Sequence, residues 1–258
     1  MDLKSKVCLV TGGTKGIGAA AAIALAEQGA LVSIAARTID DEARKTRSRI
    51  EALGRKCLLL AADVAKSADL SRMVDETVRA LGPVDVLLHA AGGPVNGGLF
   101  DLTPEQWHAA FDVHVHPIFH LARAVIPAMK EKKEGVILLV SSTAGIRGVR
   151  TNVAYQTVKG AIPQLVRALA FEFAEWNIRV NGVAPGIIRT AFHAKMPVEV
   201  KDHNLKNRIP LHREGTPEQV ASVIRELITN DYVTGETYTI DGGLTMRICC
   251  ACSVLRKR

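Results

Sequence analysis

The sequence predicts an α/β protein in which a doubly wound parallel sheet is covered by helices on both faces. Short runs of Val, Leu, Ile and Ala alternate along the chain with longer amphipathic segments, which is the order expected of repeated strand–helix units. The apolar runs are continuous rather than alternating in polarity, as in strands buried on both faces. The 258 residues, 48% of them hydrophobic, suit a single domain over 1–258, because α/β domains commonly reach about 250 residues.

Seven strands are predicted from the apolar runs, at Val7–Val10, Leu31–Ala35, Lys56–Leu60, Val84–His89, Gly135–Val140, Arg179–Val183 and Glu236–Ile240. Six helices are predicted between them, at Gly16–Gln28, Asp40–Leu53, Ala68–Leu81, Pro104–Met129, Asn152–Glu175 and Pro217–Leu227. Thr103 and Thr216 each precede a proline and stand three residues before a glutamine, which predicts capped helix starts at both places. The least regular stretch, residues 190–213, is a candidate substrate lid, and residues 244–258 form a C-terminal tail.

Composition excludes several classes of protein. The net charge of +7 comes from Lys and Arg scattered along helical segments, and no zinc-finger or zipper pattern accompanies them, so we expect no nucleic-acid partner. Five cysteines without framework spacing indicate a reducing compartment. The three in the tail lack a fourth adjacent ligand, and no metal site is expected. No apolar run approaches about 20 residues and no leader precedes the first strand, so we expect a cytoplasmic protein without a membrane partner.

A glycine-rich loop, Thr11-Gly12-Gly13-Thr14-Lys15-Gly16-Ile17-Gly18, joins the first strand to the first helix. Glycines let a backbone approach a pyrophosphate closely, and a helix N-terminus offers unpaired N–H groups to the anion. The strand before the loop and the helix after it supply the context that a glycine string alone lacks. We therefore expect a Rossmann-type fold that binds a dinucleotide.

The second strand ends in Ala35-Ala36-Arg37, where NAD-binding proteins usually place an acid against the ribose hydroxyls. Arg37 and Lys15 are two cations with no carboxylate at that point, which favours the extra phosphate of NADP(H). The alternative is that Arg37 and Lys15 are solvated surface charges.

Tyr155 and Lys159 stand four residues apart at the start of a predicted helix, and Ser142 directly follows the fifth strand region. Positions i and i+4 share one face of a helix, so the ammonium of Lys159 can lie close to the phenol. A nearby positive charge lowers a tyrosine pKa from its usual value near ~10, which would fit Tyr155 for proton exchange near neutral pH.

These motifs resemble the classical short-chain dehydrogenase/reductase family in its NADP(H)-preferring form. The resemblance covers almost the whole chain and includes the glycine loop, Asp63-Val64, Ala90-Ala91-Gly92, Ser142, Tyr155-x-x-x-Lys159, Arg179-Val180-Asn181, Pro185-Gly186 with Thr190, and Asp241-Gly242-Gly243. It implies an oxidoreductase that transfers hydride between NADP(H) and a small-molecule ketone or alcohol, and it implies a homotetramer. Apolar residues at helical spacing, Phe111, Ile118, Leu121 and Val125, suit either subunit contacts or the protein's own core.

The resemblance also assigns roles. Tyr155 would be the general acid in reduction and the general base in oxidation, Lys159 would bind the nicotinamide ribose and lower the tyrosine pKa, and Ser142 would hydrogen-bond the reacting oxygen. Cofactor contacts are expected from Gly12, Thr14, Lys15, Gly16, Ile17, Gly18, Arg37, Asp63, Val64, Ala91, Gly92, Tyr155, Lys159, Pro185, Gly186, Ile188 and Thr190.

Two positions depart from the family pattern. His114 stands where the family has an asparagine that helps carry protons from the lysine, and His89 replaces the first asparagine of an Asn-Asn-Ala-Gly segment. A neutral imidazole has one donor and one acceptor, so His114 either replaces the relay as a fourth catalytic residue or is a packed histidine that fills the space. For His89 we expect a hydrogen-bonded core residue at a strand end.

The sequence defines the substrate less narrowly than the cofactor. An anionic carbonyl compound would suit Arg147, Arg150, Asn152, Arg189, His193 and Lys195 if they face inward, although such residues are usually exposed. A 3-oxoacyl carrier-protein reductase-like enzyme is an alternative; Lys133 matches such reductases, whereas Trp176 occupies another position that is basic in them. A cofactor-binding regulatory protein without turnover is an alternative of a different class.

Overall fold

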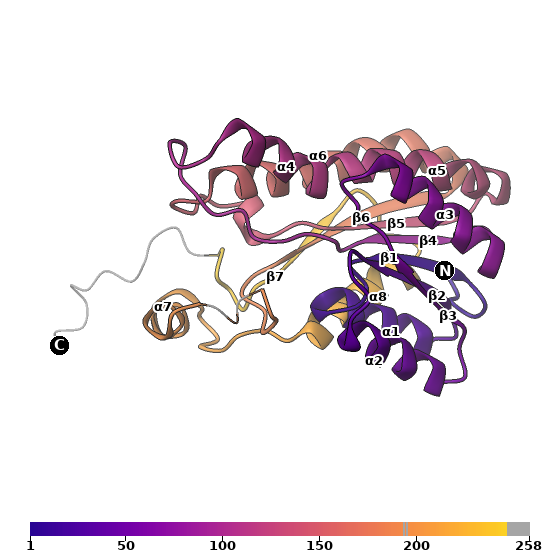
Figure 1. Cartoon of the computed structure of the whole chain (residues 1–258), viewed down its shortest axis with the longest axis horizontal. Helices are drawn as coiled ribbons and strands as arrows, with labels where there is room; N and C mark the ends of the chain where they lie inside the picture. The colour runs from indigo at the N-terminus through magenta and orange to yellow at the C-terminus, as the bar shows by residue number, and fades with distance from the viewer. Residues whose placement is uncertain (193, 195, 247–258) are drawn as a thin grey trace.

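Seven parallel strands form one sheet in the order β3-β2-β1-β4-β5-β6-β7 in the computed structural model, which describes residues 1–192, 194 and 196–246 (Figure 1). The strands are β1 Val7–Thr11, β2 Leu31–Ala36, β3 Cys57–Ala61, β4 Val86–His89, β5 Gly135–Val140, β6 Ile178–Pro185 and β7 Thr237–Ile240. The chain order reverses between β1 and β4, and ligands of open α/β sheets bind in the crevice at such a switch point. The predicted doubly wound α/β fold is confirmed.

Helices cover both faces of this sheet. They are α1 Gly16–Glu27, α2 Asp41–Ala52, α3 Ser67–Leu81, α4 Pro104–His114, α5 His116–Lys132, α6 Val153–Phe173, α7 Val198–His203 and α8 Pro217–Thr229, with short turns at Thr143–Gly145, Ala174–Trp176 and Asn204–Arg208. Figure 1 shows α1, α2 and α8 on one face, and α3, α5 and α6 on the other with α4 at their end. Both predicted capping boxes, at Thr103 and Thr216, are present.

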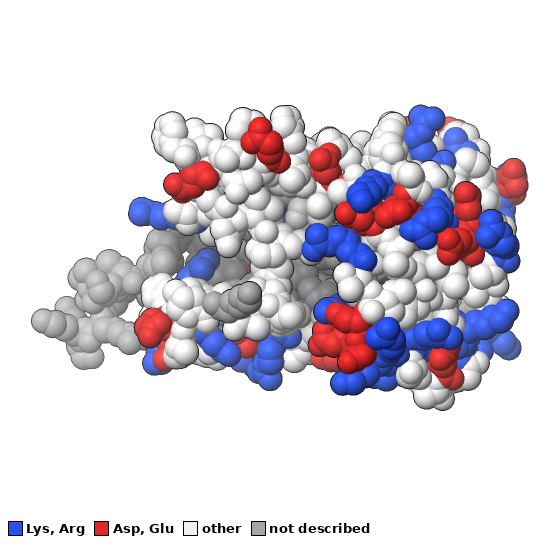
Figure 2. Space-filling view, in the orientation of Figure 1, with Lys and Arg blue, Asp and Glu red and all other residues white. Residues whose placement is uncertain are grey.

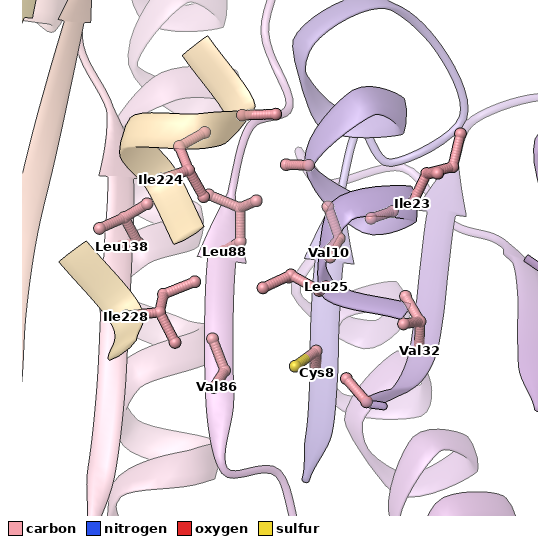
Figure 3. Packing of buried hydrophobic residues seen from close by; sticks show 14 of the residues in the cluster. Cys8, Val10, Ile23, Leu25, Val32, Val86, Leu88, Leu138, Ile224 and Ile228 are labelled. Carbon is pink, nitrogen blue, oxygen red and sulfur yellow. The ribbon is translucent and has the colours of Figure 1, made fainter. Parts of the chain in front are cut away.

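Two aliphatic clusters, one on each face, hold the layers together. On one face, Ile23 and Leu25 of α1 and Ile224 and Ile228 of α8 pack on Val86 and the neighbouring residues of the central strands (Figure 3). On the other face, the cluster joins α3, α5 and α6 to the same strands. Cys8 and Cys57 are buried free thiols, as expected from their places in apolar runs. Burial of both faces fixes the sheet, and with it the positions of the loops that leave its carboxyl edge.

The prediction of one helix over 104–129 is wrong, because the chain forms two helices there. The amide of Val115 still donates to the carbonyl of Phe111 at 2.9 Å, but Val115 itself has φ −120° and ψ −56°. Pro117 has no amide hydrogen, and its ring would clash with the carbonyl four residues earlier, so an unbroken helix is disfavoured there. α5 therefore starts at His116, where proline is tolerated in the first turn.

The proposed lid region contains regular structure that the sequence did not predict. Within residues 190–213, α7 is followed directly by the π-helical turn Asn204–Arg208, and the side chain of Asn204 is buried. Of the tail at 244–258, only residues 244–246 are described, and the three tail cysteines lie outside the described residues.

The surface carries both signs of charge. Figure 2 shows Lys and Arg side chains interspersed with Asp and Glu over the face it presents, including the region of α1 and α2. Such mixing is not the continuous basic stripe of a nucleic-acid site. Among the residues described, no helix is both long and apolar enough to cross a membrane, and no group of His, Cys, Asp and Glu side chains has the arrangement of a metal site.

Candidate active site

The glycine loop lies between the end of β1 and the start of α1, and its glycines are required by close contacts. Gly12 has φ +65°, and a Cβ there would lie 2.8 Å from the Cα of Ala91. A Cβ on Gly18 would collide with the carbonyl oxygen of Gly12. The loop can therefore approach both its own helix and the end of β4 only without side chains at these positions.

The N-terminus of α1 is open to an anion. Lys15 stands at its N-cap position without making a side-chain cap, and no acidic residue lies in the first turn, whereas Asp40, Thr103 and Thr216 cap α2, α4 and α8. Uncapped amides and the helix dipole attract negative charge. The loop and helix start therefore fit the pyrophosphate of a dinucleotide, with Thr14, Gly16, Ile17 and Gly18 as the expected contacts.

The segment after β6 reaches the same loop. A Cβ on Gly16, which has φ +53°, would lie 3.2 Å from Cγ2 of Thr190. Pro185 ends β6, and the amide of Gly186 donates to Ile240 at 2.9 Å. Ile188 is buried in the core cluster beneath. The structure thus brings Thr190 to the glycine loop and places Pro185 and Gly186 at the carboxyl edge, while the side chain of Ile188 turns into the protein.

At the adenosine end, the expectation of cations without carboxylates is wrong. Nζ of Lys15 lies 2.5 Å from Oδ2 of Asp40 and 3.1 Å from Oε2 of Glu42. Arg37 is exposed at the end of β2. The clue in the sequence was the predicted helix start at Asp40, because a helix cap three residues after Arg37 brings its carboxylate back toward the strand end.

Asp63 and Val64 lie just beyond the end of β3. The backbone amide of Asp63 donates to Asp69 at 2.8 Å, and its carboxylate accepts from the amide of Ala65 at 3.1 Å. Val64 is buried. These contacts fix the turn, so the expected adenine contacts are held in place by the start of α3.

Ser142 and Tyr155 meet at the carboxyl end of β5. Ser142 caps the short turn that follows β5, with its Oγ accepting from the amide of Ala144 at 3.1 Å. Tyr155 lies in the first turn of α6. Burial raises the pKa of the Tyr155 phenol, and its hydrogen bond with Ser142 acts in the opposite direction. The serine therefore holds the phenol at the sheet edge and favours its ionised form.

Lys159 is buried one turn further along α6, with 5% of its surface exposed. Its Nζ donates to the carbonyl of Val140 at 2.7 Å and lies 5.8 Å from the centroid of the Tyr155 ring. Burial lowers the pKa of this ammonium to about 7. The predicted lowering of the Tyr155 pKa by Lys159 is not seen in this structure, in which burial raises the pKa of the phenol and the lysine donates to the strand.

His114 closes the site from the end of α4. Its Nε2 lies 3.1 Å from the carbonyl oxygen of Gly93. The amide of Gly93 lies 3.5 Å from the same nitrogen. The contact with the carbonyl is the shorter one, and because a carbonyl only accepts, we assign the proton of the neutral ring to Nε2 and leave Nδ1 as an acceptor. Burial, and then the charge of Lys159, lower the pKa of His114 to about 3. The ring is therefore neutral at physiological pH, and Nδ1 is buried without a partner among the described residues.

Gly92 is fitted to this histidine. A Cβ on Gly92 would lie 2.6 Å from Cε1 and 2.9 Å from Nδ1 of His114, and the neighbouring Ala91 touches the glycine loop. His89 lies deeper, at the end of β4, where its Nδ1 is 2.8 Å from Oγ1 of Thr11. Burial lowers the pKa of His89 to about 3. The expectation of a hydrogen-bonded core histidine at position 89 is confirmed.

Phe192 is a site residue that sequence reasoning missed. Its ring centroid lies 5.9 Å from that of Tyr155, at an interplanar angle of 45°. The only signal was its place two residues after Thr190, in the proposed lid. An aromatic side chain here gives the catalytic tyrosine candidate an apolar neighbour on the side of the lid.

Two of the residues considered for an anionic substrate make contacts elsewhere in the protein. Arg189 pairs with the buried Glu214 at 3.4 Å, and Arg147 donates to the carbonyl of Thr245 at 3.4 Å. Arg150 is exposed, and the Oδ1 atom of Asn152 is buried without a partner in the described chain. His193 and Lys195 lie outside the described residues. The described contacts therefore give an anionic substrate little support.

A cavity of about 490 Å³ lies on the other side of the glycine loop, between α1, α2 and α8. It is lined by Lys15 and Glu42 but by none of the catalytic candidates. The candidate active site remains the cluster of Ser142, Tyr155, Lys159 and His114. We identify it by its titratable groups, which lie close together, and not by the volume of a cavity.

Comparison with known proteins identifies the family. A family model described as enoyl-(acyl carrier protein) reductase matches residues 12–245. The chain is 36% identical to 3-oxoacyl-(acyl-carrier-protein) reductase FabG of Thermotoga maritima over 95% of this chain and 100% of that protein. It is 33% identical to human dehydrogenase/reductase SDR family member 4 over 95% of this chain and 90% of that one.

Solved structures agree with these relatives. A short-chain dehydrogenase/reductase from Serratia marcescens superposes with a TM-score of 0.88 at 29% identity, over 95% of this chain and 99% of that one. With a matching family model over most of its length and relatives above 30% identity, the chain belongs to the short-chain dehydrogenase/reductase family, whose members are oxidoreductases that use a nicotinamide cofactor.

Proposed function

We propose that this protein transfers hydride between NADP(H) and a small-molecule ketone or secondary alcohol, with Tyr155 as the general acid and base. The observation that carries the proposal is the hydrogen bond between Ser142 and Tyr155 beside the buried Lys159. A binding protein without turnover has no need of these three groups together. When bound, the nicotinamide cofactor supplies or accepts the hydride at the substrate carbon.

The residues of the chain handle the oxygen and its proton. Ser142 and Tyr155 hold the carbonyl oxygen of the substrate, and Tyr155 donates its proton as negative charge develops there. In the reverse direction the phenolate accepts the proton of the alcohol. Lys159 binds the ribose hydroxyls of the nicotinamide half and returns a proton toward the phenol. His114 lies behind them with a free acceptor at Nδ1, which supports a proton path through this ring.

The exposed guanidinium of Arg37 favours NADP(H) over NAD(H). Arg37 is exposed just after β2, where an adenosine 2′-phosphate would lie, and Lys15 belongs to the glycine loop. Guanidinium groups bind phosphate in a bidentate manner. A direct test is the ratio of NADPH to NADH activity in the wild type and in Arg37→Ala, and a preference for NADH in the wild type would contradict this assignment.

The activity itself is tested by oxidation of NADPH with a panel of ketones. Tyr155→Phe should lower turnover by about 10²–10⁴-fold, because general acid–base groups contribute on that scale. Tyr232→Phe is the matched control, since Tyr232 is 98% exposed and should behave as wild type. Wild-type protein that binds NADPH but reduces no ketone would favour the regulatory alternative.

A second candidate substrate is a 3-oxoacyl group on a carrier protein. It is favoured by the 36% identity to a reductase of that name, and Lys133 is exposed at the end of α5. Against it, Lys130 lies over Trp176 at 3.8 Å, and Lys132 pairs with Asp85 at 2.7 Å, so neither is a free cation for an acidic carrier. The two substrate classes are separated by comparing kcat/KM for a 3-oxoacyl carrier protein with kcat/KM for the matching free 3-oxo thioester. Only an enzyme specific for the carrier protein should have the higher kcat/KM with it.

We further propose a homotetramer built on α5 and α6. Ile118, Leu121 and Val125 are buried in the subunit's own core, so they do not form subunit contacts. Phe119 on α5 is 59% exposed and Phe171 on α6 is 90% exposed. Large exposed aromatic residues on neighbouring helices are typical of a protein interface.

A further inference from the structure

Three elements converge around Lys15. Lys15 belongs to the glycine loop, Arg37 follows β2, and Asp40 and Glu42 are the N-cap and a first-turn residue of α2. The loop and α2 are also joined by a buried hydrogen bond from Oγ1 of Thr46 to the carbonyl of Thr14, at 3.0 Å. The first turn of α2 is therefore held beside the loop, and both carboxylates lie next to Lys15.

Asp40 uses its two carboxylate oxygens for different purposes. Oδ1 accepts from the amide of Ala43 at 3.0 Å and caps α2, while Oδ2 accepts from Nζ of Lys15. Glu42 adds a second carboxylate to the same ammonium. The hydrogen bond with Lys15 lowers the pKa of Asp40, and hydrogen bonds with both carboxylates raise the pKa of Lys15, so the charged forms of Asp40 and Lys15 are favoured.

The next carboxylate along the helix is not part of this cluster. Asp41 lies between Asp40 and Glu42 in sequence, yet it is 90% exposed and pairs with Arg44 at 3.1 Å. Arg37 makes no hydrogen bond or ion pair among the described residues, so it does not neutralise Asp40 or Glu42 by direct contact. The charges of Lys15 and Arg37 are thus balanced by those of Asp40 and Glu42, and a phosphate of charge about −2 would meet a neutral rather than a doubly positive site.

We propose that Asp40 and Glu42 set the cofactor discrimination of this enzyme, by competing with the adenosine 2′-phosphate for Lys15. The inference rests on the proposed dinucleotide function of the same site. The 2′-phosphate must displace or share an ammonium that already holds two carboxylates, whereas a 2′-hydroxyl makes no such demand. The preference for binding NADP(H) over NAD(H) is therefore weaker than it would be with Lys15 and Arg37 alone.

The test measures binding rather than turnover, on the full chain. Dissociation constants for NADPH, NADH, adenosine 2′,5′-bisphosphate and AMP are determined by calorimetry for the wild type, Asp40→Asn, Glu42→Gln and the double variant. Asn caps a helix as well as Asp does, so Asp40→Asn keeps the contact with Ala43. Asp41→Asn is the matched control, because it removes the same charge from the same helical turn without touching Lys15.

Exposed ion pairs are weak, and removing one changes a dissociation constant by at most about fivefold. Each single variant should therefore tighten binding of the two 2′-phosphorylated ligands about two- to fivefold, and the double variant more, with NADH and AMP nearly unchanged. The gain should shrink at high salt. Asp41→Asn should change binding less than either variant.

Three results would overturn the inference: unchanged NADPH binding in the double variant, equal changes for NADPH and NADH, or weaker NADH binding, which would assign the carboxylates to the ribose hydroxyls. The preference of the wild type is a separate readout. A wild type that binds NADH more tightly contradicts the proposed use of NADP(H). If its double variant nevertheless gains affinity for NADPH alone, the role of Asp40 and Glu42 stands.

Discussion

The imidazole of His114 stands edge-on to the ring of Tyr155, with ring centroids 5.8 Å apart and planes at 88°. The two side chains come from different helices, α4 and α6, and both border the buried Lys159. A histidine in this place is neutral, because burial and the lysine charge lower its pKa to about 3. Its hydrogen bond to Gly93 directs the remaining acceptor into the protein interior.

His114→Leu should lower turnover while sparing NADPH affinity, since leucine fills the space but accepts no proton. His114→Asn should recover part of the loss, because an amide offers both a donor and an acceptor. Turnover across pH 5–10, together with the NADPH dissociation constant, is the measurement. Equal turnover in His114→Leu and wild type would show that the ring is only a packing element.

Lys159→Met should stabilise the fold near neutral pH. The pKa of Lys159 in the folded protein is about 7, below its ordinary value of 10.5. At a pH between these two pKa values, Lys159 is protonated in the unfolded chain but has released its proton in the folded one. Wild-type stability therefore rises with pH across that window. Urea unfolding at pH 7 and pH 9.5 should show the advantage of the variant, a few kcal/mol at pH 7, shrinking at the higher pH. A gap that is constant with pH would contradict burial of the charge as its cause.

Phe192→Ala should raise KM for bulky apolar ketones by up to about tenfold, because a lost aromatic contact with the substrate costs roughly 1 kcal/mol. Small ketones that do not reach the ring should be affected less. Phe192→Leu is the conservative control, and its KM for bulky ketones should lie between those of the wild type and Phe192→Ala. Identical KM values for large and small ketones in Phe192→Ala would remove this residue from the substrate site.

Phe119→Asp combined with Phe171→Asp should dissociate the proposed tetramer, since each change places a charge in an apolar contact. Light scattering after gel filtration reports the mass. Tyr232→Asp is a suitable control, as this exposed aromatic residue lies outside α5 and α6. A wild-type monomer, or variants that remain tetrameric, would contradict this interface.

The sequence predicted the sheet well because a parallel strand buried on both faces is apolar throughout. It predicted the glycine loop because the close contacts of that loop leave no room for side chains. It did not predict the helix break at Val115, where Pro117 lacks an amide hydrogen and its ring would clash with the preceding turn. Nor did it reveal the carboxylates on Lys15 or the ring of Phe192 beside Tyr155. Those contacts join residues from separate elements, so they depend on how the elements pack rather than on spacing.

The fit between Gly92 and His114 restricts the order in which these two positions can change. With the imidazole in place, even a methyl group at position 92 would come within 2.6 Å of the ring, closer than Cβ atoms approach in folded proteins. A smaller side chain at 114 must therefore be acquired before any side chain appears at 92. The chain can lose its unusual histidine in one step, but it can lose this glycine only in two.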